Sequence, residues 1–336
     1  MHNSLTRVLA QESGTNFQMY NGDCIPVAEG IPDNSIDYTI SSPPFENLYI
    51  YSDSEADMGN SSDSHEFFEH FKFLIEELHR ITVKGRLCSI HCKDLPRYRG
   101  RDGAAGLADF PGKIIAAFEE VGWQYHSRVT IWKDPVIEMT RTKNHGLLYK
   151  NLREYAEVSR QGMADYLLTF RKWEGLDKDT TQSDKPVKHS SDIEMQYYGV
   201  LPLGDSGDER DISRGRFYWH NLKIWQRYAS PVWMDIDQTD VLNFQVARDN
   251  ADEKHICPLQ LGVIRRGIDL WTNPGDVVFD PFGGIGSTPV VALEMHRKAV
   301  AVELKPGYFD IAVKNLKEAE LKAGQMDMFT FAGVAL

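Results

Sequence analysis

Hydrophobic and polar positions alternate along the chain between short β-like runs and longer helical runs. Ile36-Asp37-Tyr38-Thr39-Ile40 alternates with a period of two, and similar short apolar stretches predict strands at 19–23, 86–91, 125–132, 166–170, 277–280 and 300–303. Helical spacing relates Phe67, Phe68, Phe71, Leu74, Ile75 and Leu78, and helices are also expected at 24–30, 112–121 and 254–271. Strands that alternate with helices indicate an α/β protein with a doubly wound sheet and helices on both faces.

The pattern weakens at three places, which suggests how the chain is organised. Residues 1–16 carry little pattern, and we expect a loosely held arm there. The alternation fails again at 173–230, where the polar stretch 177–191 is predicted to be a loop. We therefore predict one large domain made of the halves 17–172 and 231–320, with an inserted region at 173–230 and a C-terminal tail at 321–336.

A glycine-rich turn follows the predicted strand at 277–280. It reads Asp280-Pro281-Phe282-Gly283-Gly284-Ile285-Gly286, and then Ser287-Thr288-Pro289. Glycine has no Cβ and tolerates positive φ, so a ligand can approach this backbone closely, and free N–H groups of the next helix attract negative charge. Ser287 or Thr288 is expected to cap that helix, with Pro289 at its first position. A nucleotide-like ligand is expected, but NAD fits poorly because the third position of G-x-G-x-x-G/A is Pro289.

A second short motif, Ser42-Pro43-Pro44-Phe45, follows the predicted strand at 36–40. Two prolines remove two backbone donors and restrict φ, so this peptide cannot join a central strand and must leave the sheet as a stiff loop. Such a loop at the carboxyl end of a strand is well placed for chemistry.

These motifs resemble those of the β class of DNA amino-methyltransferases, which are dependent on S-adenosylmethionine. That family has a D-P-F-x-G-x-G cofactor loop and a [D/N/S]-P-P-[Y/F/W] catalytic loop, which match Asp280 to Gly286 and Ser42 to Phe45. The run Lys254-His255-Ile256-Cys257-Pro258 is similar to the K-H-P segment before the cofactor strand, although Ile256 stands where many members have proline. The resemblance covers about residues 17–316, in the order catalytic loop, recognition region, cofactor loop, and implies a Rossmann-like methyltransferase sheet with an inserted target-recognition region.

The resemblance also implies roles for particular residues. Asp23, after the first strand, would accept from the amino group of the cofactor's adenine, and Glu303 would bind its ribose hydroxyls; the alternatives are a helix cap for Asp23 and a solvated strand-end acid for Glu303. The catalytic residues would be Ser42, Pro43, Pro44 and Phe45. The cofactor-binding residues would be Asp23, Cys24, Ser42, His255, Pro258, Asp280, Pro281, Phe282, Gly284, Gly286, Ser287, Thr288, Glu303 and Leu304.

The chemistry of an amino group explains the catalytic loop. Conjugation with the ring makes the nitrogen lone pair of a base unavailable, and acceptors aimed at its hydrogens favour the nucleophilic form. Ser42 Oγ and the Pro43 carbonyl can supply these acceptors, and Phe45 can stack on the base after it is flipped out of the duplex. A leading serine often accompanies cytosine N4 in restriction-type relatives, but the wider similarity to solitary phage-type enzymes favours adenine N6, with cytosine N4 as the alternative.

Charge is segregated along the chain. The formal net charge is −12 and the pI is about 5.4, yet binding depends on local patches rather than on the average. The stretch 46–79 is strongly acidic, whereas 128–172 and 209–227 are basic, and Arg214-Gly215-Arg216-Phe217-Tyr218-Trp219-His220 interleaves bases with aromatics. Such a mixture suits phosphate contacts and stacking, although an aromatic mini-core with solvated bases would look the same. We expect double-stranded DNA to bind Arg141, Lys143, Arg214, Arg216, Lys223 and Arg227.

The remaining composition narrows the class of protein. Cys24, Cys88, Cys92 and Cys257 form no C-x-x-C pair and are interpreted as reduced thiols, and no metal site is expected, because Cys88, His91 and Cys92 would alternate faces on a strand. No apolar run approaches the roughly 20 residues that span a bilayer, so a soluble, cytoplasmic protein is expected. The resemblance also implies a homodimer, with the acidic stretch after Phe45 as a candidate contact surface.

Two other functions share some of these features. An RNA or protein-amide methyltransferase uses a similar Pro-Pro loop, but its cofactor motif normally precedes that loop. A non-catalytic dinucleotide-binding module would need the glycine fingerprint that Pro289 interrupts.

Overall fold

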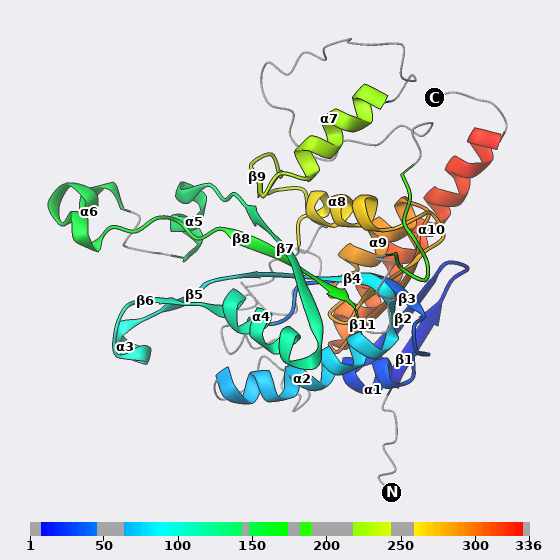
Figure 1. Cartoon of the computed structure of the whole chain (residues 1–336), viewed down its shortest axis with the longest axis horizontal. Coiled ribbons are helices and arrows are strands. Elements are labelled where there is room, and N and C mark those ends of the chain that lie inside the picture. Colours follow the sequence, from blue (N-terminus) through cyan, green and yellow to red (C-terminus); the bar gives the residue numbers. More distant parts are fainter. Residues whose placement is uncertain are drawn as a thin grey trace, which may run out of the picture.

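The centre of the molecule is a nine-stranded sheet in the order β1-β2-β11-β10-β3-β4-β8-β7-β9 (Figure 1). The computed structural model describes residues 8–45, 64–142, 148–173, 182–189, 218–242 and 259–331. The strands of this sheet are β1 Val8–Ser13, β2 Phe17–Gly22, β3 Ile36–Ser41, β4 Thr82–Lys93, β7 Trp123–Ile131, β8 Asp165–Lys172, β9 Val232–Trp233, β10 Val277–Asp280 and β11 Lys298–Glu303. A separate hairpin of β5 Leu95–Arg97 and β6 Gly106–Ala108 extends from the end of β4.

The middle of the sheet is parallel. The neighbours β2, β11, β10, β3 and β4 all run in one direction, so their carboxyl ends meet at one edge. β8 is antiparallel to both β4 and β7, and β1 is antiparallel to β2 at the other margin. A parallel sheet places the loops that follow its strands side by side, where α/β proteins bind ligands.

Helices cover both faces of the sheet. The helices are α1 Cys24–Glu29, α2 Ser64–Ile81, α3 Arg99–Asp102, α4 Phe110–Val121, α5 Pro135–Thr142, α6 Tyr149–Glu154, the 3-10 turn η4 Ala156–Val158, α7 Tyr218–Tyr228, α8 Leu261–Trp271, α9 Ser287–Glu294 and α10 Pro306–Phe331. One apolar core joins α1, α2 and α4 to the sheet, and a second joins α8, α9 and α10 to the opposite face (Figure 1). The predicted doubly wound α/β architecture is confirmed.

Burial explains why the predicted helices form where they do. The helically spaced residues Phe67, Phe71, Leu74, Ile75 and Leu78 are all buried on one side of α2. The predicted stop of the helix at 112–121 is confirmed, because Gly122 adopts φ 105° and its N–H bonds the last turn of α4.

Three details of the sequence-based prediction differ from the structure. The helix expected at 254–271 begins only at Leu261, with Gln260 at its N-cap. α9 begins at Ser287, directly after Gly286, which adopts a left-handed φ of 94°. No side chain caps this helix. Ser287 and Thr288 are its first two residues rather than its caps, and Pro289 is its third residue rather than its first. The tight glycine turn occupies the position where a capping side chain would otherwise stand. The expected loose arm also contains β1, because its backbone finds partners along the exposed edge of β2.

The described part of the inserted region has two pieces. Residues 182–189 lack regular structure, as predicted, but Ser183 Oγ donates to the Lys84 carbonyl at 2.7 Å, and Lys185 Nζ lies 2.6 Å from Asp37 Oδ2 and 2.8 Å from Asp276 Oδ1. This segment is therefore tied to the edge at which the parallel strands begin. The second piece, α7, packs beside α8 through Ile224 and Tyr228.

None of the helices in the described part of the chain is long and apolar enough to cross a membrane.

Candidate active site

The two predicted loops are neighbours at the carboxyl edge of the sheet. β3 leads into Ser42-Pro43-Pro44-Phe45 and β10 leads into the glycine turn, and the two strands are paired in parallel with Phe279 opposite Thr39. The first turn of α9 reaches the end of β3, since Thr288 Oγ1 donates to the Ile40 carbonyl at 3.4 Å. Motifs that lie far apart in the sequence thus share one edge.

The glycine turn presents its backbone to open space. Gly284 has φ 53°, and a Cβ placed on it would meet no heavy atom within 4 Å. A Cβ on Gly283, in contrast, would lie 3.2 Å from the Val302 carbonyl oxygen, because Gly283 N–H bonds that carbonyl at 2.7 Å. Gly283 therefore allows the turn to pack on β11, whereas Gly284 leaves room for a ligand. This cradle fits a nucleotide-like group beside α9.

The acids predicted to bind the cofactor lie at the same edge. Glu303 accepts the backbone N–H groups of Gly284 and Lys305, each at 2.8 Å, so its carboxylate braces the glycine turn. Asp23 Oδ1 accepts the N–H of Ile25 at 3.0 Å and caps α1, which is the alternative role considered for it. Asn21 Nδ2 donates to the carbonyls of Glu303 and Leu304 and joins the ends of β2 and β11.

Asp280 is a buried acid at the start of the turn. Burial raises the pKa of its carboxyl to about 6, although the Thr288 hydroxyl and the Phe282 N–H, at 3.0 Å, oppose that rise. The carboxylate orders the turn by accepting this N–H, at the cost of a buried charge at neutral pH.

The predicted catalytic loop has one half-buried polar residue, Ser42, and one buried aromatic residue, Phe45. Phe45 is 7% exposed and meets Phe110 edge-on, with ring centroids 6.1 Å apart, while Lys93 Nζ lies 5.8 Å from the centre of its ring. Phe45 is the last residue of the predicted loop, and its ring belongs to the core around α2 and α4, so stacking on a base stays a prediction.

Sequence reasoning missed a polar chain behind Ser42. Ser42 Oγ lies 3.0 Å from His91 Nδ1, His91 Nε2 lies 3.1 Å from Asp165 Oδ2, and Lys133 Nζ lies 2.6 Å from the same carboxylate oxygen. Burial by itself would raise the pKa of Asp165, but the hydrogen bond with His91 and the charge of Lys133 outweigh it and hold that pKa well below its usual range. His91 was considered only as a metal ligand, and no local pattern marks Asp165.

The zinc cluster weighed for β4 does not form a shared site. Cys88 and Cys92 lie in the core formed with α2 and α4, whereas His91 bonds Ser42 and Asp165. In the described ranges, no group of three His, Cys, Asp or Glu residues is arranged to hold a metal ion.

The remaining predicted residues fall partly inside and partly outside the described ranges. His255, Pro258, Lys143, Arg214 and Arg216 lie outside the described residues, as does the side chain of Arg141. Lys223 and Arg227 are half-buried on α7, which also exposes Trp225. The base of this helix is held by Arg266, whose guanidinium lies 5.0 Å from the ring centres of both Tyr228 and Trp233.

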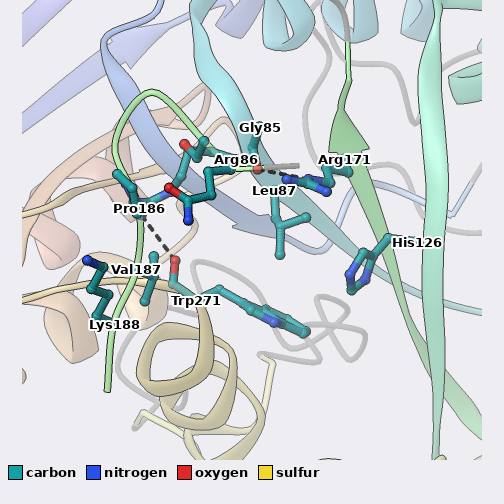
Figure 2. Close-up of a pocket in the computed structure, with 11 residues that line it drawn as sticks. Gly85, Arg86, Leu87, His126, Arg171, Pro186, Val187, Lys188 and Trp271 are labelled. Atoms are coloured by element: carbon teal, nitrogen blue, oxygen red, sulfur yellow. Dashed lines mark hydrogen bonds between the residues drawn. The ribbon is translucent and has the colours of Figure 1, made fainter. Parts of the chain in front are cut away.

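A cavity of about 450 Å³ lies at the opposite edge of the sheet (Figure 2). Its lining includes Leu87, His126, Arg171 and Trp271, and Figure 2 shows these side chains around the start of β4 and the end of α8. Because parallel strands present their ligand-binding loops at their carboxyl ends, this cavity is separate from the candidate site.

Comparison with known proteins identifies the family. The model of the N6/N4 methyltransferase family, described as DNA methylase, matches residues 36–314, a span that includes both loops and the polar chain behind Ser42. The chain belongs to the DNA methylase family. This methylase is 26% identical over 304 residues to the type II methyltransferase M.BglII of Bacillus subtilis, with 89% of this chain and 68% of that protein covered. It is 24% identical to the orphan methyltransferase M.BamHII of Bacillus amyloliquefaciens, with 86% of this chain and 91% of that protein covered.

Solved structures share the fold of the methylase. A putative DNA modification methylase, TTHA0409 from Thermus thermophilus, in complex with S-adenosyl-L-methionine, has a TM-score of 0.57 at 18% identity and covers 91% of this chain and 96% of its own. The PvuII DNA methyltransferase, described as cytosine-N4-specific, also has a TM-score of 0.57, at 16% identity, with 93% of each chain covered. The predicted Rossmann-like methyltransferase sheet is therefore confirmed.

Proposed function

We propose that this methylase transfers the methyl group of S-adenosylmethionine to the exocyclic amino group of a flipped base in double-stranded DNA. The observation that carries the proposal is the pairing of β3 with β10, which sets the Ser42 loop beside the glycine turn. Family membership supports the reaction class, and the complex of TTHA0409 with S-adenosyl-L-methionine supports the cofactor.

The residues at the edge fit the proposed cofactor. The turn from Asp280 to Thr288 would hold the methionine part beside the open backbone of Gly284, with Glu303 and Asp23 near the ribose and adenine. When bound, S-adenosylmethionine supplies an electrophilic methyl group. The other roles belong to the chain's own residues: Ser42 Oγ and the Pro43 carbonyl would accept from the amino hydrogens, and Phe45 would pack on the base.

For the target base we propose cytosine N4 ahead of adenine N6, the reverse of the order expected from the sequence. The adenine expectation rested on similarity to solitary phage-type enzymes, but the relatives include both the type II methyltransferase M.BglII and the orphan methyltransferase M.BamHII, so that similarity favours neither base. What favours cytosine N4 is the leading serine, which often accompanies that target among restriction-type relatives. The description of the PvuII enzyme as cytosine-N4-specific supports the same order.

Nucleoside analysis tests this function. Purified protein is incubated with unmethylated plasmid and S-adenosylmethionine, the DNA is digested, and N4-methylcytosine and N6-methyladenine are measured by mass spectrometry. N4-methylcytosine is expected, and N6-methyladenine alone would restore the order predicted from the sequence. Total RNA serves as the competing substrate, and methylation of RNA without DNA would contradict the proposed substrate.

The proposal includes DNA binding by the inserted region and a homodimer, as the family resemblance implies. Sedimentation velocity at micromolar concentration tests the dimer, and a monomer under those conditions would remove it from the proposal.

A further inference from the structure

Side chains from different parts of the sheet converge behind Ser42. His91 comes from β4, Asp165 is the first residue of β8, and Lys133 follows the end of β7. These side chains are 8%, 11% and 12% exposed, respectively, so the ion pair that ends the chain is largely shielded from water. The antiparallel pairing of β4 with β8, in which Lys93 stands opposite Asp165, brings the carboxylate to His91.

The carboxylate determines which nitrogen of His91 carries a proton. Asp165 is held ionised by Lys133, and an ionised carboxylate can only accept hydrogen bonds. His91 Nε2 must therefore be the donor at 3.1 Å. In the neutral ring Nδ1 is then left with its lone pair, and the Ser42 hydroxyl must donate to it at 3.0 Å.

We propose, resting on the function proposed above, that His91 receives through Ser42 the proton released by the target amino group, and that Asp165 and Lys133 hold His91 in the tautomer that can receive it. With its own hydrogen directed at His91, Ser42 Oγ turns its lone pairs outward from the polar chain. Serine at the head of the catalytic loop carries no charge of its own. The buried carboxylate of Asp165 supplies that charge two hydrogen bonds away.

The proton transfer balances without any further reactant. As the amino nitrogen forms its bond to the methyl group, the methyl–sulfur bond breaks and its electron pair stays on sulfur. The amino N–H proton passes to Ser42 Oγ while the Ser42 hydroxyl proton passes to His91 Nδ1. The products are the methylated amine, a neutral serine and an imidazolium that faces the Asp165 carboxylate, so the positive charge of the sulfonium ends on His91.

A purely structural role for the chain predicts different behaviour. A buried histidine with two satisfied nitrogens can simply fasten β4 to β8. What favours the relay is that Ser42 is half-buried at the ligand edge, so the chain runs from the proposed reaction centre to an internal ion pair. The tests must therefore distinguish proton transfer by His91 from a purely structural role in holding β4 and β8 together.

Nitrogen NMR of the protein without cofactor reads the tautomer directly. With ¹⁵N-labelled histidine, His91 is expected to show a protonated Nε2 and an unprotonated Nδ1, assigned by comparison with His91→Asn. Ser42→Ala should shift the Nδ1 resonance, because the accepted hydrogen bond is lost. A protonated Nδ1 in the neutral ring would overturn the proposal.

Single-turnover methylation measures the contribution to the reaction. The side chain in His91→Asn can still form a hydrogen bond with Ser42 but cannot receive a proton at neutral pH. This variant should therefore slow methyl transfer by about 100-fold or more, which is the range of general-base effects. Its affinity for S-adenosylmethionine, measured by calorimetry, should stay unchanged. Added imidazole should restore part of the rate in His91→Gly. His126→Asn, an exposed histidine at the opposite edge, is the matched control and should behave as wild type.

The outcomes separate the proton relay from the proposed methyltransferase function. Wild-type protein that methylates no DNA amino group refutes the proposed function. A methylating wild type with His91→Asn as fast as His126→Asn refutes the relay alone, as does a slow His91→Gly that imidazole fails to accelerate. Asp165→Asn provides a second variant if melting curves show His91→Asn to be unfolded, and it should be similarly slow.

Discussion

Glu303 accepts the backbone N–H of Gly284 at 2.8 Å, which ties the glycine turn after β10 to the end of β11. The same carboxylate accepts the N–H of Lys305 at 2.8 Å. A side chain expected to bind a ribose therefore also holds the backbone that surrounds the ligand. If it also binds the ribose as proposed, its contribution to cofactor binding would combine direct contact with preorganisation of the turn.

Glu303→Ala should weaken S-adenosylmethionine binding and lower the melting temperature. The bonds to Gly284 in the turn and to Lys305 after β11 are both lost, and each hydrogen bond to a charged group is worth about 1.5–3 kcal/mol. Glu303→Gln keeps one carbonyl oxygen as an acceptor and should be intermediate in both properties. Calorimetry and thermal melts measure the two effects, with the exposed α10 variant Glu318→Ala as the control. Unchanged affinity in folded Glu303→Ala would remove this residue from the cofactor site.

Gly284→Asn should fold but bind S-adenosylmethionine at least about tenfold more weakly, a loss of about 1.4 kcal/mol. Asparagine tolerates the φ of 53° at this position better than other side chains, and the space around the missing Cβ is open, so the added bulk acts on the ligand rather than on the fold. Gly275→Asn is the matched control, since Gly275 has φ 82° and equally open surroundings at the start of β10. Equal affinities of the two variants would contradict the placement of the cofactor.

Phe45→Leu should separate packing from catalysis when it is compared with Phe110→Leu. The two rings meet edge-on in one core, so each substitution should reduce the free energy of unfolding, by about 1 kcal/mol for this lost aromatic pair. Phe110→Leu should lower it further, because Phe110 also pairs with Phe67 and Phe68. Only Phe45→Leu should also slow methyl transfer, because only Phe45 belongs to the loop that we propose packs on the base. Denaturant melts and single-turnover rates provide the comparison, and equally fast variants would confine Phe45 to the core.

Asp280→Asn should stabilise the protein more at pH 8 than at pH 4. The pKa of Asp280 is raised from 3.8 to about 6 in the folded state, so the folded protein binds more protons than the unfolded chain between these values and wild-type stability falls as the pH rises through them. A shift of roughly two units corresponds to about 3 kcal/mol. The Asn variant lacks this loss. Melting temperatures of wild type and Asp280→Asn across this pH range test the prediction, with the exposed variant Asp310→Asn as the control. Parallel pH profiles of Asp280→Asn and wild type would contradict the prediction.

Lys223→Gln and Arg227→Gln should each weaken DNA binding and make its salt dependence shallower. A phosphate contact releases about 0.9 counterion from duplex DNA, so the slope of log affinity against log salt should fall by about that amount per lost charge. Fluorescence anisotropy over a salt series measures the slope. Lys314→Gln, exposed on α10, should leave the slope unchanged. Wild-type slopes in both α7 variants would show that Lys223 and Arg227 do not contact DNA phosphates.

Local features of the sequence were sufficient to predict the frame of the site. The alternation at 36–40 corresponds to β3, the apolar run at 277–280 to β10, and Gly284 and Gly286 both adopt positive φ. These features are determined over a few residues, because period-two burial, ring-restricted prolines and missing Cβ atoms act on the chain where they occur. The order of the motifs was likewise enough to indicate the family that the comparison confirms.

Only the tertiary structure decided what these residues contact. His91 and Asp165 meet because β8 pairs antiparallel with β4 in one register, and shifting that register by one residue would turn the shifted side chain to the other face. Lys133 reaches the same carboxylate because β7 pairs with β8, with Ile131 opposite Asp165. Asp23 caps α1 and Glu303 braces the glycine turn for the same kind of reason. Strand order and register follow from burying both faces of the sheet at once, which depends on all the strands together, so no local stretch of sequence contains them.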